Sequence, residues 1–304
     1  MVKKLILDTD PGIDDALALI AAVSCREAEV LGVSVVAGNL PLETVTANAS
    51  AILAFLDSPA RVYPGATGPL YGKLQDASDI HGPGGLGGWR LKPDPNRVAC
   101  CHAAEFMART AAAFPGQVTL VTLGPLTNLA LALEQHPREM QKLAGVVIMG
   151  GALRVPGNVT STAEFNIWAD PDAAQLVLNS GLDLTMVGLD VTKNMRLEKE
   201  DISRLAGGGA AARGAARMIE YAVREQGEYP FHDPLAFMAA VQPECFAFDT
   251  VPVAIETRGA ICRGQTIADY SGPGNPGEVK VARKADYSKC RDFLLELWLD
   301  APDR

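Results

Sequence analysis

Four aspartates stand close together near the start of the chain, where they could hold a metal ion. Residues 5–19, LILDTDPGIDDALAL, contain them within eight positions: Asp8, Asp10, Asp14 and Asp15. Carboxylates so close repel one another, and without a cation at least one of them should take up a proton. A hard ion such as Ca²⁺ or Mg²⁺ would remove that conflict, because the nearby donors are oxygens and no Cys or His lies among them.

The aspartates also have a simpler interpretation, as caps of neighbouring secondary structure. Asp14 and Asp15 fall in the first turn of an expected helix, where the positive end of the helix dipole favours carboxylates. Asp8 could cap the preceding strand. Capping accounts for one or two carboxylates of the four, so the sequence favours a metal site.

A strand, a tight turn and a helix are expected to position these aspartates. Residues 2–7 form a short stretch of branched residues bounded by Pro11-Gly12, which is typical of a buried strand that leaves a sheet at its carboxyl end. Apolar residues then recur at helical spacing from Ala16 to Val23. In an open α/β sheet, ligands bind at such a strand-to-helix turn.

The rest of the chain alternates expected strands with expected helices. A strand at 29–37 and a helix at 42–56 complete a βαβ unit, which predicts a parallel sheet with right-handed crossovers. Later strands are expected at 61–63, 117–123, 146–149, 184–189, 251–257 and 278–282. Later helices are expected at 101–114, after 124–128 to about 134, at 170–178, 197–205 and 210–225, from 230–234 onward, and at 287–299. The predicted fold class is therefore α/β. It is a Rossmann-like, open and mostly parallel sheet with helices on both faces and the active site at the carboxyl ends of its strands, in one domain over residues 1–304.

The composition is typical of a globular protein and excludes several kinds of partner. The 304 residues are 48% hydrophobic and 21% charged, with a formal net charge of −9 and no prominent Lys/Arg cluster, so no nucleic-acid partner is expected. No apolar run approaches the ~20 residues of a membrane span, and the short run after Lys3-Lys4 does not resemble a signal peptide. Six scattered cysteines are expected to be mostly buried thiols of a cytoplasmic protein.

Residues 64–96 form a long Gly- and Pro-rich segment with neither a helical nor a strand period. A loop of this length in a compact domain is usually a lid or binding loop, or disordered. Its HGPGGLGG contains a GxGxxG pattern, but no strand precedes it and no helix follows, so a dinucleotide site is not expected. An isolated loop histidine such as His81 is more often exposed than functional. We nevertheless expect residues 72–89 to close over a bound sugar and to carry His81 with them.

Residues 152–169 mix polar hydrogen-bonding side chains with aromatic ones. They include Asn158, Glu164, Phe165, Asn166 and Trp168. This mixture suits a sugar better than a phosphate, and it is equally compatible with an ordinary polar loop.

A DxD pattern at the end of a strand permits three functions. A haloacid-dehalogenase-type phosphatase would use Asp8 as its nucleophile, but that family has Thr or Val where Gly12 stands here. An EF-hand-like calcium loop fails, because position twelve counted from Asp8 is Leu19 and not Glu. A non-catalytic sugar-binding module could use the same polar loops, but it would not need the His232-Asp233 pair.

Five motifs, in order along the chain, resemble those of the inosine-uridine nucleoside hydrolases. They are DTDPGIDDALAL at 8–19, VVAGN at 35–39, LGPLTNLALAL at 123–133, EFN at 164–166 and HDP at 232–234. The resemblance implies a Ca²⁺-dependent enzyme that hydrolyses the N-glycosidic bond of ribonucleosides, with uridine, cytidine or inosine as substrate, in nucleoside salvage or catabolism. It also implies a homo-oligomer, either a dimer or a tetramer.

The same resemblance implies roles for individual residues. The Ca²⁺ ligands would be Asp10, Asp15, the main-chain carbonyl of Leu123, and Asp233. Ribose hydroxyls would be bound by Asp14, Asn39, Asn158, Glu164 and Asn166, whereas His81, Met149 and Phe165 would line the site near the sugar or base.

Two catalytic roles follow from the resemblance and the chemistry of glycoside hydrolysis. Asp10 would help to activate the attacking water, and His232 would protonate the departing base. The imidazole of His232 is present in nonspecific and pyrimidine-preferring members of the family and absent from purine-specific ones. Tyr221, Arg224 and Tyr229, just before HDP, are candidates for selecting the base.

Overall fold

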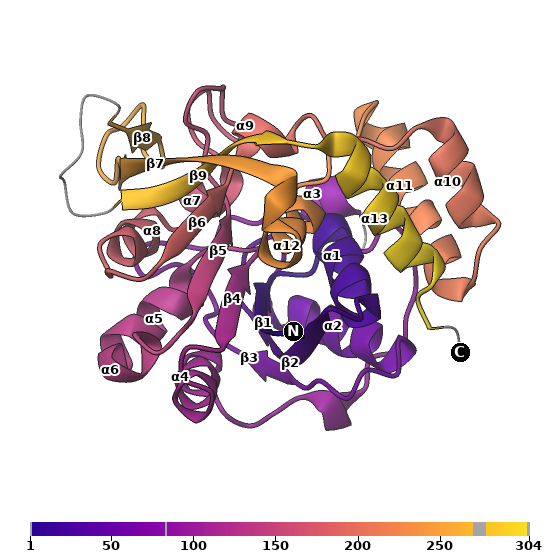
Figure 1. Cartoon of the computed structure of the whole chain (residues 1–304), viewed down its shortest axis with the longest axis horizontal. Helices are drawn as coiled ribbons and strands as arrows, with labels where there is room; N and C mark the ends of the chain where they lie inside the picture. Colours follow the sequence, from indigo (N-terminus) through magenta and orange to yellow (C-terminus); the bar gives the residue numbers. More distant parts are fainter. Residues whose placement is uncertain (1, 83, 270–277, 303–304) are drawn as a thin grey trace.

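A computed structural model describes residues 2–82, 84–269 and 278–302. Its centre is a sheet with the strand order β3-β2-β1-β4-β5-β6-β9-β7-β8 (Figure 1). The strands are β1 (Lys3–Thr9), β2 (Ala28–Val35), β3 (Val62–Pro64), β4 (Val118–Thr122), β5 (Gly145–Met149), β6 (Leu184–Val187), β7 (Phe246–Ile255), β8 (Thr266–Ala268) and β9 (Glu278–Ala285). Neighbours from β3 to β9 in this order run parallel, and β7 pairs antiparallel with both β9 and β8. The predicted mostly parallel α/β sheet is confirmed.

Helices cover both faces of the sheet (Figure 1). One face carries α1 (Ile13–Ser24), α2 (Leu42–Phe55), α11 (Ala210–Gln226), α12 (Asp233–Val241) and α13 (Tyr287–Leu299), and the other carries α4 (Ala103–Ala113), α5 (Thr127–Gln135) and α8 (Pro171–Leu178). The shorter elements are α3 (Ser78–His81), α6 (Pro137–Met140), α7 (Phe165–Ala169), α9 (Leu189–Thr192), α10 (Lys199–Ala206), and the 3₁₀ turns η1 (Pro95–Arg97) and η2 (Pro243–Cys245). None of the described helices is long and apolar enough for a membrane span.

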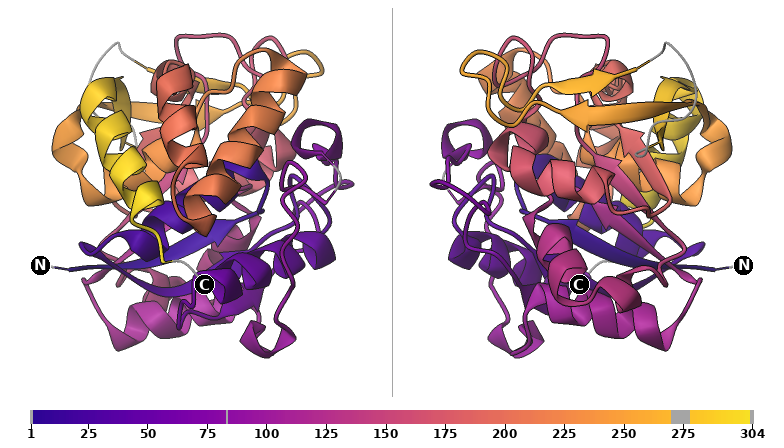
Figure 2. Two further views of the ribbon diagram at one scale, coloured as in Figure 1. Left: turned by 90° about the vertical axis from the view of Figure 1, so that its right-hand side faces the viewer. Right: turned by 90° about the vertical axis from the view of Figure 1, so that its left-hand side faces the viewer.

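The central strand β1 shows why the sheet needs two helical layers. Leu5 and Leu7 belong to one buried cluster, and Ile6 belongs to the cluster on the opposite face. Successive side chains of a strand point to opposite faces, so the consecutive apolar residues Leu5, Ile6 and Leu7 require apolar layers on both faces of the sheet. Trp298 of α13 donates its indole N–H to the Leu17 carbonyl at 2.9 Å, which ties the last helix to α1. Figure 2 shows α13 beside α10 and α11 on this face.

The register of the sheet brings the site residues together. Asp8 lies opposite Ser34 of β2 and Thr122 of β4 in two parallel pairings. Because parallel strands end at the same edge, the segments that follow β1, β2 and β4 meet there. Asp10, Asn39 and Leu123 lie on these three segments.

The sequence analysis missed the shortest elements. The segment 64–96 was expected to have no regular structure, but it contains the one-turn helix α3 and the turn η1, while α6, α7, α9 and β8 were also not predicted. Elements of three to five residues are too short to show a helical or strand period. The cysteines also differ from expectation, since Cys25 and Cys290 are buried but Cys100 is exposed and the other three are half-buried.

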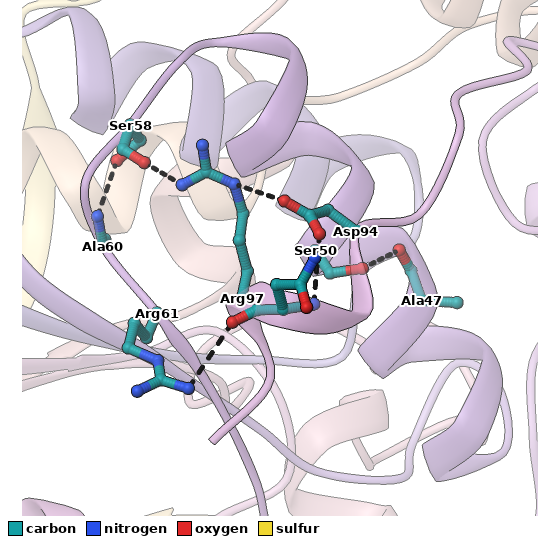
Figure 3. Close-up of polar contacts among 8 residues, drawn as sticks. Ala47, Ser50, Ser58, Ala60, Arg61, Asp94 and Arg97 are labelled. Atoms are coloured by element: carbon teal, nitrogen blue, oxygen red, sulfur yellow. Dashed lines mark hydrogen bonds and ion pairs between the residues drawn. The ribbon is translucent and has the colours of Figure 1, made fainter.

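Polar contacts fasten the end of the segment 64–96 to the connection between α2 and β3 (Figure 3). The Arg97 guanidinium donates to the Ser58 carbonyl, and its Nε lies 3.4 Å from Asp94 Oδ2. Arg61 Nη2 donates to the Val98 carbonyl at 3.2 Å. These contacts fix the position at which the long segment rejoins the body of the protein.

Candidate active site

A cavity of about 270 Å³ opens at the carboxyl ends of the central strands. All the residues to which the sequence analysis gave a metal, sugar, base or catalytic role line this cavity, except Asp10 and Asp15. Those that line it are Asp14, Asn39, His81, Leu123, Met149, Asn158, Glu164, Phe165, Asn166, His232 and Asp233. Asp10 and Asp15 are fully buried. The cavity therefore gathers side chains that are as much as 219 positions apart in the sequence, from Asp14 to Asp233.

Three buried carboxylates lie closest together in this site. Asp14, Asp15 and Asp233 each offer an oxygen within 4.8 Å of the other two. Asp10 is outside this closest group, although it is adjacent to it. Its Oδ2 accepts the Asn39 main-chain N–H at 2.6 Å, and its buried Oδ1 has no hydrogen-bond partner in the described part of the chain.

Asp15 organises the turn between β1 and α1. Its Oδ1 accepts the Thr9 hydroxyl at 2.5 Å and the Asp10 N–H at 3.1 Å, and its Oδ2 accepts the Gly12 N–H and the Asn39 side-chain amide, both at 3.1 Å. One carboxylate thus holds the DTDPG turn and the segment after β2 in place. The position of Asp15 in the first turn of α1 agrees with the capping interpretation as well as with a metal site.

The charges of this group conflict with one another. Burial raises the pKa of Asp10 and of Asp233 well above the ordinary value, and repulsion by neighbouring carboxylates adds to the shift. Burial and the charge of Asp15 raise the pKa of Asp14 to about 7. A divalent cation would compensate these charges and satisfy the unpartnered Asp10 oxygen, so the donor set fits a hard metal ion.

Asp8 is bound by a side chain of α5 and does not belong to the closest group of carboxylates. It accepts the Asn128 side-chain amide at 2.8 Å, and Asn128 also donates to the Val35 carbonyl and accepts the Ala66 N–H. Burial raises the pKa of Asp8 to about 6. The hydrogen bonds of Asn128 thus join Asp8 of β1 to the start of α5 and to the start of the long segment.

Glu164 and Asn166 form the wall opposite α1. Glu164 caps α7, since its carboxylate accepts the Asn166 and Ile167 N–H groups, and it also accepts the Gly151 N–H at 2.9 Å. The Asn166 side-chain amide donates to the Leu123 carbonyl at 2.6 Å. The Leu123 carbonyl therefore faces the polar side of the cavity.

The imidazole of His232 lines the cavity next to Asp233. Its Nδ1 lies 2.7 Å from the hydroxyl of Thr192, a buried residue at the end of α9. Burial and the nearby His81 lower the pKa of His232 to about 4, so the ring is neutral at pH 7 in this structure. The ordinary pKa of an imidazole is about 6.5, and this shift depends on tertiary packing that the sequence alone does not show.

The three candidates for base selection lie in different surroundings. Tyr229 lines the cavity, and its hydroxyl donates to Asp14 Oδ1 at 3.2 Å. Tyr221 and Arg224 do not line it; the Arg224 guanidinium lies 5.2 Å from the Tyr221 ring centroid, and Tyr221 packs against Gly82. Sequence reasoning missed Gln226, which lines the cavity at the end of α11, and Thr192, because neither belongs to a recognisable motif.

Comparisons with known proteins agree with this geometry. A family model described as inosine-uridine preferring nucleoside hydrolase matches residues 5–292. Uridine nucleosidase 1 of Arabidopsis thaliana is 39% identical over 278 residues, which cover 88% of this chain and 82% of that protein. The pyrimidine-specific ribonucleoside hydrolase RihB of Shigella flexneri is 34% identical over 292 residues, 93% of each. A solved structure titled purine-preferring ribonucleoside hydrolase, from Gardnerella vaginalis, is 30% identical with a TM-score of 0.92, covering 98% of this chain and 99% of that one.

The chain belongs to the inosine-uridine preferring nucleoside hydrolase family. It is therefore a hydrolase that acts on N-glycosyl compounds, and specifically a ribonucleoside hydrolase. The predicted family and enzyme class are confirmed.

In this nucleoside hydrolase His81 of the segment 72–89 is packed against the start of α1. His81 is 6% exposed, and its Nδ1 accepts the Ile13 N–H at 3.1 Å. Asn48 donates to the carbonyls of both Pro11 and Gly84. A Cβ atom added to Gly12 would lie 2.6 Å from the His81 ring, so the imidazole needs the space that a glycine leaves there.

We expect a ribose-like inhibitor to protect this segment from trypsin at Lys73 and Arg90, because closure over the sugar would hold His81 in place. Gly12→Ala should reduce that protection, since its methyl group would displace the His81 ring. Limited proteolysis with and without a saturating inhibitor measures both effects. Equal cleavage rates in the wild type under the two conditions would contradict a role of this segment in closure.

Proposed function

We propose that this enzyme hydrolyses uridine, cytidine or inosine to ribose and free base in a Ca²⁺-dependent reaction, in nucleoside salvage or catabolism. One observation carries the proposal. The cavity combines a cluster of buried carboxylates, hydrogen-bonding residues suited to ribose, and the imidazole of His232. Names of relatives support both base classes, since one is a uridine nucleosidase, one is pyrimidine-specific and one is purine-preferring.

Calcium would be held by Asp10, Asp15, the Leu123 carbonyl and Asp233. All these donors are oxygens, and the unpartnered Oδ1 of Asp10 and the mutual repulsion of the carboxylates support a divalent ion there. Calcium accepts six to eight oxygen ligands in flexible geometry, which suits a site that also receives sugar hydroxyls. When bound, the ion would act as a Lewis acid that makes a water molecule more acidic and orients the ribose.

The side chains around the ion would bind the ribose and accept a proton from the attacking water. Asp14, Asn39, Glu164 and Asn166 line the cavity and would hold the ribose hydroxyls, with Asn158 at its exposed rim. Asp10 would accept the proton as water attacks C1′, a contribution typically worth ~10²–10⁴ in rate. The reaction passes through an oxocarbenium-like transition state, which these oxygen-rich surroundings stabilise.

The neutral imidazole of His232 would donate a hydrogen bond from its ring N–H to the base as the N-glycosidic bond breaks. The base departs with its bonding electron pair, so negative charge develops on it and a hydrogen-bond donor at that position lowers the barrier. Met149, His81 and Phe165 would enclose the sugar and base beside it.

We further propose that the chain forms a single catalytic domain that assembles as a homodimer or homotetramer in the cytoplasm. The family resemblance supports the assembly, and the six free thiols support a reducing compartment.

A substrate panel tests the proposal. The purified protein should release free base from ribonucleosides without phosphate, and 2′-deoxynucleosides should be poorer substrates by on the order of 10⁴-fold, since a site built to bind a hydroxyl rejects an analogue that lacks it. Release of base is followed chromatographically. Strict dependence on inorganic phosphate would indicate a phosphorylase instead. If the protein hydrolysed p-nitrophenyl phosphate but no nucleoside, the result would indicate a phosphatase of the haloacid-dehalogenase type.

A further inference from the structure

Within residues 2–82, 84–269 and 278–302, the hydroxyl of Thr192 makes one hydrogen bond, and its partner is the imidazole of His232. The Thr192 side chain is fully buried, and its Oγ1 lies 2.7 Å from His232 Nδ1. Among the described residues, no other acceptor lies within hydrogen-bond distance of this hydroxyl. The other ring nitrogen, Nε2, makes no hydrogen bond to the described part of the chain, and the ring lines the cavity.

The direction of this hydrogen bond follows from the requirement that each buried donor has an acceptor. A hydroxyl can donate one hydrogen and accept others, whereas a neutral imidazole has one donor nitrogen and one acceptor nitrogen. If the Thr192 hydroxyl accepted from Nδ1–H, its own hydrogen would be buried without an acceptor, which is unfavourable. If it donates to Nδ1, no buried donor is lost. The ring hydrogen must then be on Nε2.

The turn that carries Thr192 is held from several directions. The Leu189 N–H donates to the Gly151 carbonyl at 2.8 Å, and Asp190 accepts the Leu153 and Arg154 N–H groups. The Tyr287 hydroxyl donates to the Val191 carbonyl at 3.0 Å. Thr192 therefore presents its hydroxyl from a rigid support, as a positioning residue must.

The geometry points to Thr192 as the residue that positions His232 for catalysis: its hydroxyl donates to Nδ1 and keeps the ring hydrogen on Nε2, facing the departing base. This inference deepens the proposed function and rests on the role of His232 in it. Thr192 does not touch the substrate and acts only through the imidazole. Without its hydroxyl the ring could carry its hydrogen on Nδ1 and present a lone pair to the base, which repels the developing charge.

Leaving-group dependence measures this role in the full chain. Thr192→Val replaces the hydroxyl by a methyl group of similar size, and kcat/KM for uridine should fall by roughly 10–100-fold, as when a group that orients a functional imidazole is removed. A p-nitrophenyl riboside needs no hydrogen on its leaving group, so its kcat/KM should stay near the wild-type value. Thr192→Ser keeps the hydroxyl and should restore uridine hydrolysis.

Thr127→Val is the matched control. The buried Thr127 hydroxyl donates to Asp170 Oδ2 at 2.7 Å and does not line the cavity, so its loss removes a comparable hydrogen bond elsewhere. This variant should lower the melting temperature without changing the ratio of the two substrates. Equal losses on both substrates for Thr192→Val, or no recovery in Thr192→Ser, would overturn the inference.

A spectroscopic measurement tests the inference without any turnover. In protein labelled with ¹⁵N-histidine at neutral pH, His232 should show a protonated Nε2 and an unprotonated Nδ1 in the wild type and in Thr192→Ser. His232→Ala assigns the signals. A wild-type ring protonated on Nδ1 would overturn the inference even if the protein hydrolyses nucleosides. If the wild type hydrolysed no nucleoside, the proposed function would be refuted. The ¹⁵N measurement would still show which ring nitrogen of His232 carries the hydrogen.

Discussion

Asp233→Asn is expected to abolish nucleoside hydrolysis without unfolding the protein, and Asp10→Asn should do the same. Both replacements keep the shape of the side chain and remove a charge that burial and neighbouring carboxylates already disfavour. The metal-free variants should therefore melt at or above the wild-type temperature. The stabilisation that calcium gives the wild type, about 2.7 kcal/mol at a concentration of 100 Kd, should be lost.

The contrast with Asp15→Ala makes this prediction specific. That variant should also be inactive, but its metal-free form should melt well below the wild type. The buried carboxylate of Asp15 accepts four hydrogen bonds, and buried donors left without an acceptor cost about 1–3 kcal/mol each. Asp170→Asn, a change at a buried acid that does not line the cavity, should retain the calcium-induced rise in melting temperature. Full activity after removal of calcium by a chelator would refute the metal site.

The effect of calcium should depend on pH. The raised pKa of Asp14, about 7, means that the metal-free folded state binds a proton that the unfolded chain releases near pH 4. This contribution to stability is fully present below pH 4 and is lost as the pH rises through about 7. Calcium must displace such protons, so the calcium-induced rise in melting temperature should increase from pH 5 to pH 7. Calorimetry with calcium and with chelator at each pH measures this difference.

His232→Ala is expected to slow the hydrolysis of natural nucleosides by roughly 10²–10³, the usual range for loss of one hydrogen-bond donor that stabilises developing negative charge. The kcat/KM of this variant for a p-nitrophenyl riboside should fall only a little, because p-nitrophenolate departs without a proton and the other groups of the site are unchanged. Each tenfold difference between the two losses in kcat/KM corresponds to about 1.4 kcal/mol of stabilisation specific to the leaving group.

His102→Ala is a control for loss of an imidazole. His102 is exposed and accepts the Ala104 N–H as the cap of α4, so this change should affect stability slightly and both substrates equally. Equal losses on both substrates for His232→Ala would mean that the change disturbs Asp233 next to it. The group that stabilises the departing base would then have to be sought elsewhere, with Tyr229 as the first candidate because it lines the cavity.

The sequence by itself determined the parts of this protein that depend on local pattern. The apolar run of β1, the DTDPG turn and the amphipathic helices have periods and turn residues that require no knowledge of distant contacts. Five motifs in register then sufficed for the family. One-turn elements such as α3, α7 and α9 were not predicted. They are too short to show a helical period of apolar residues in the sequence.

Only the tertiary structure decided how the site residues act on one another. Asp8 and Asp14 look alike in the sequence, yet the first binds Asn128 and the second faces Asp233. The sequence also contains nothing that connects Thr192 with His232. Parallel strands bring together segments that are far apart along the chain, and burial then shifts the pKa values of their ionisable side chains. The hydrogen-bond partner of His232 and its lowered pKa follow from that packing, which no local pattern encodes.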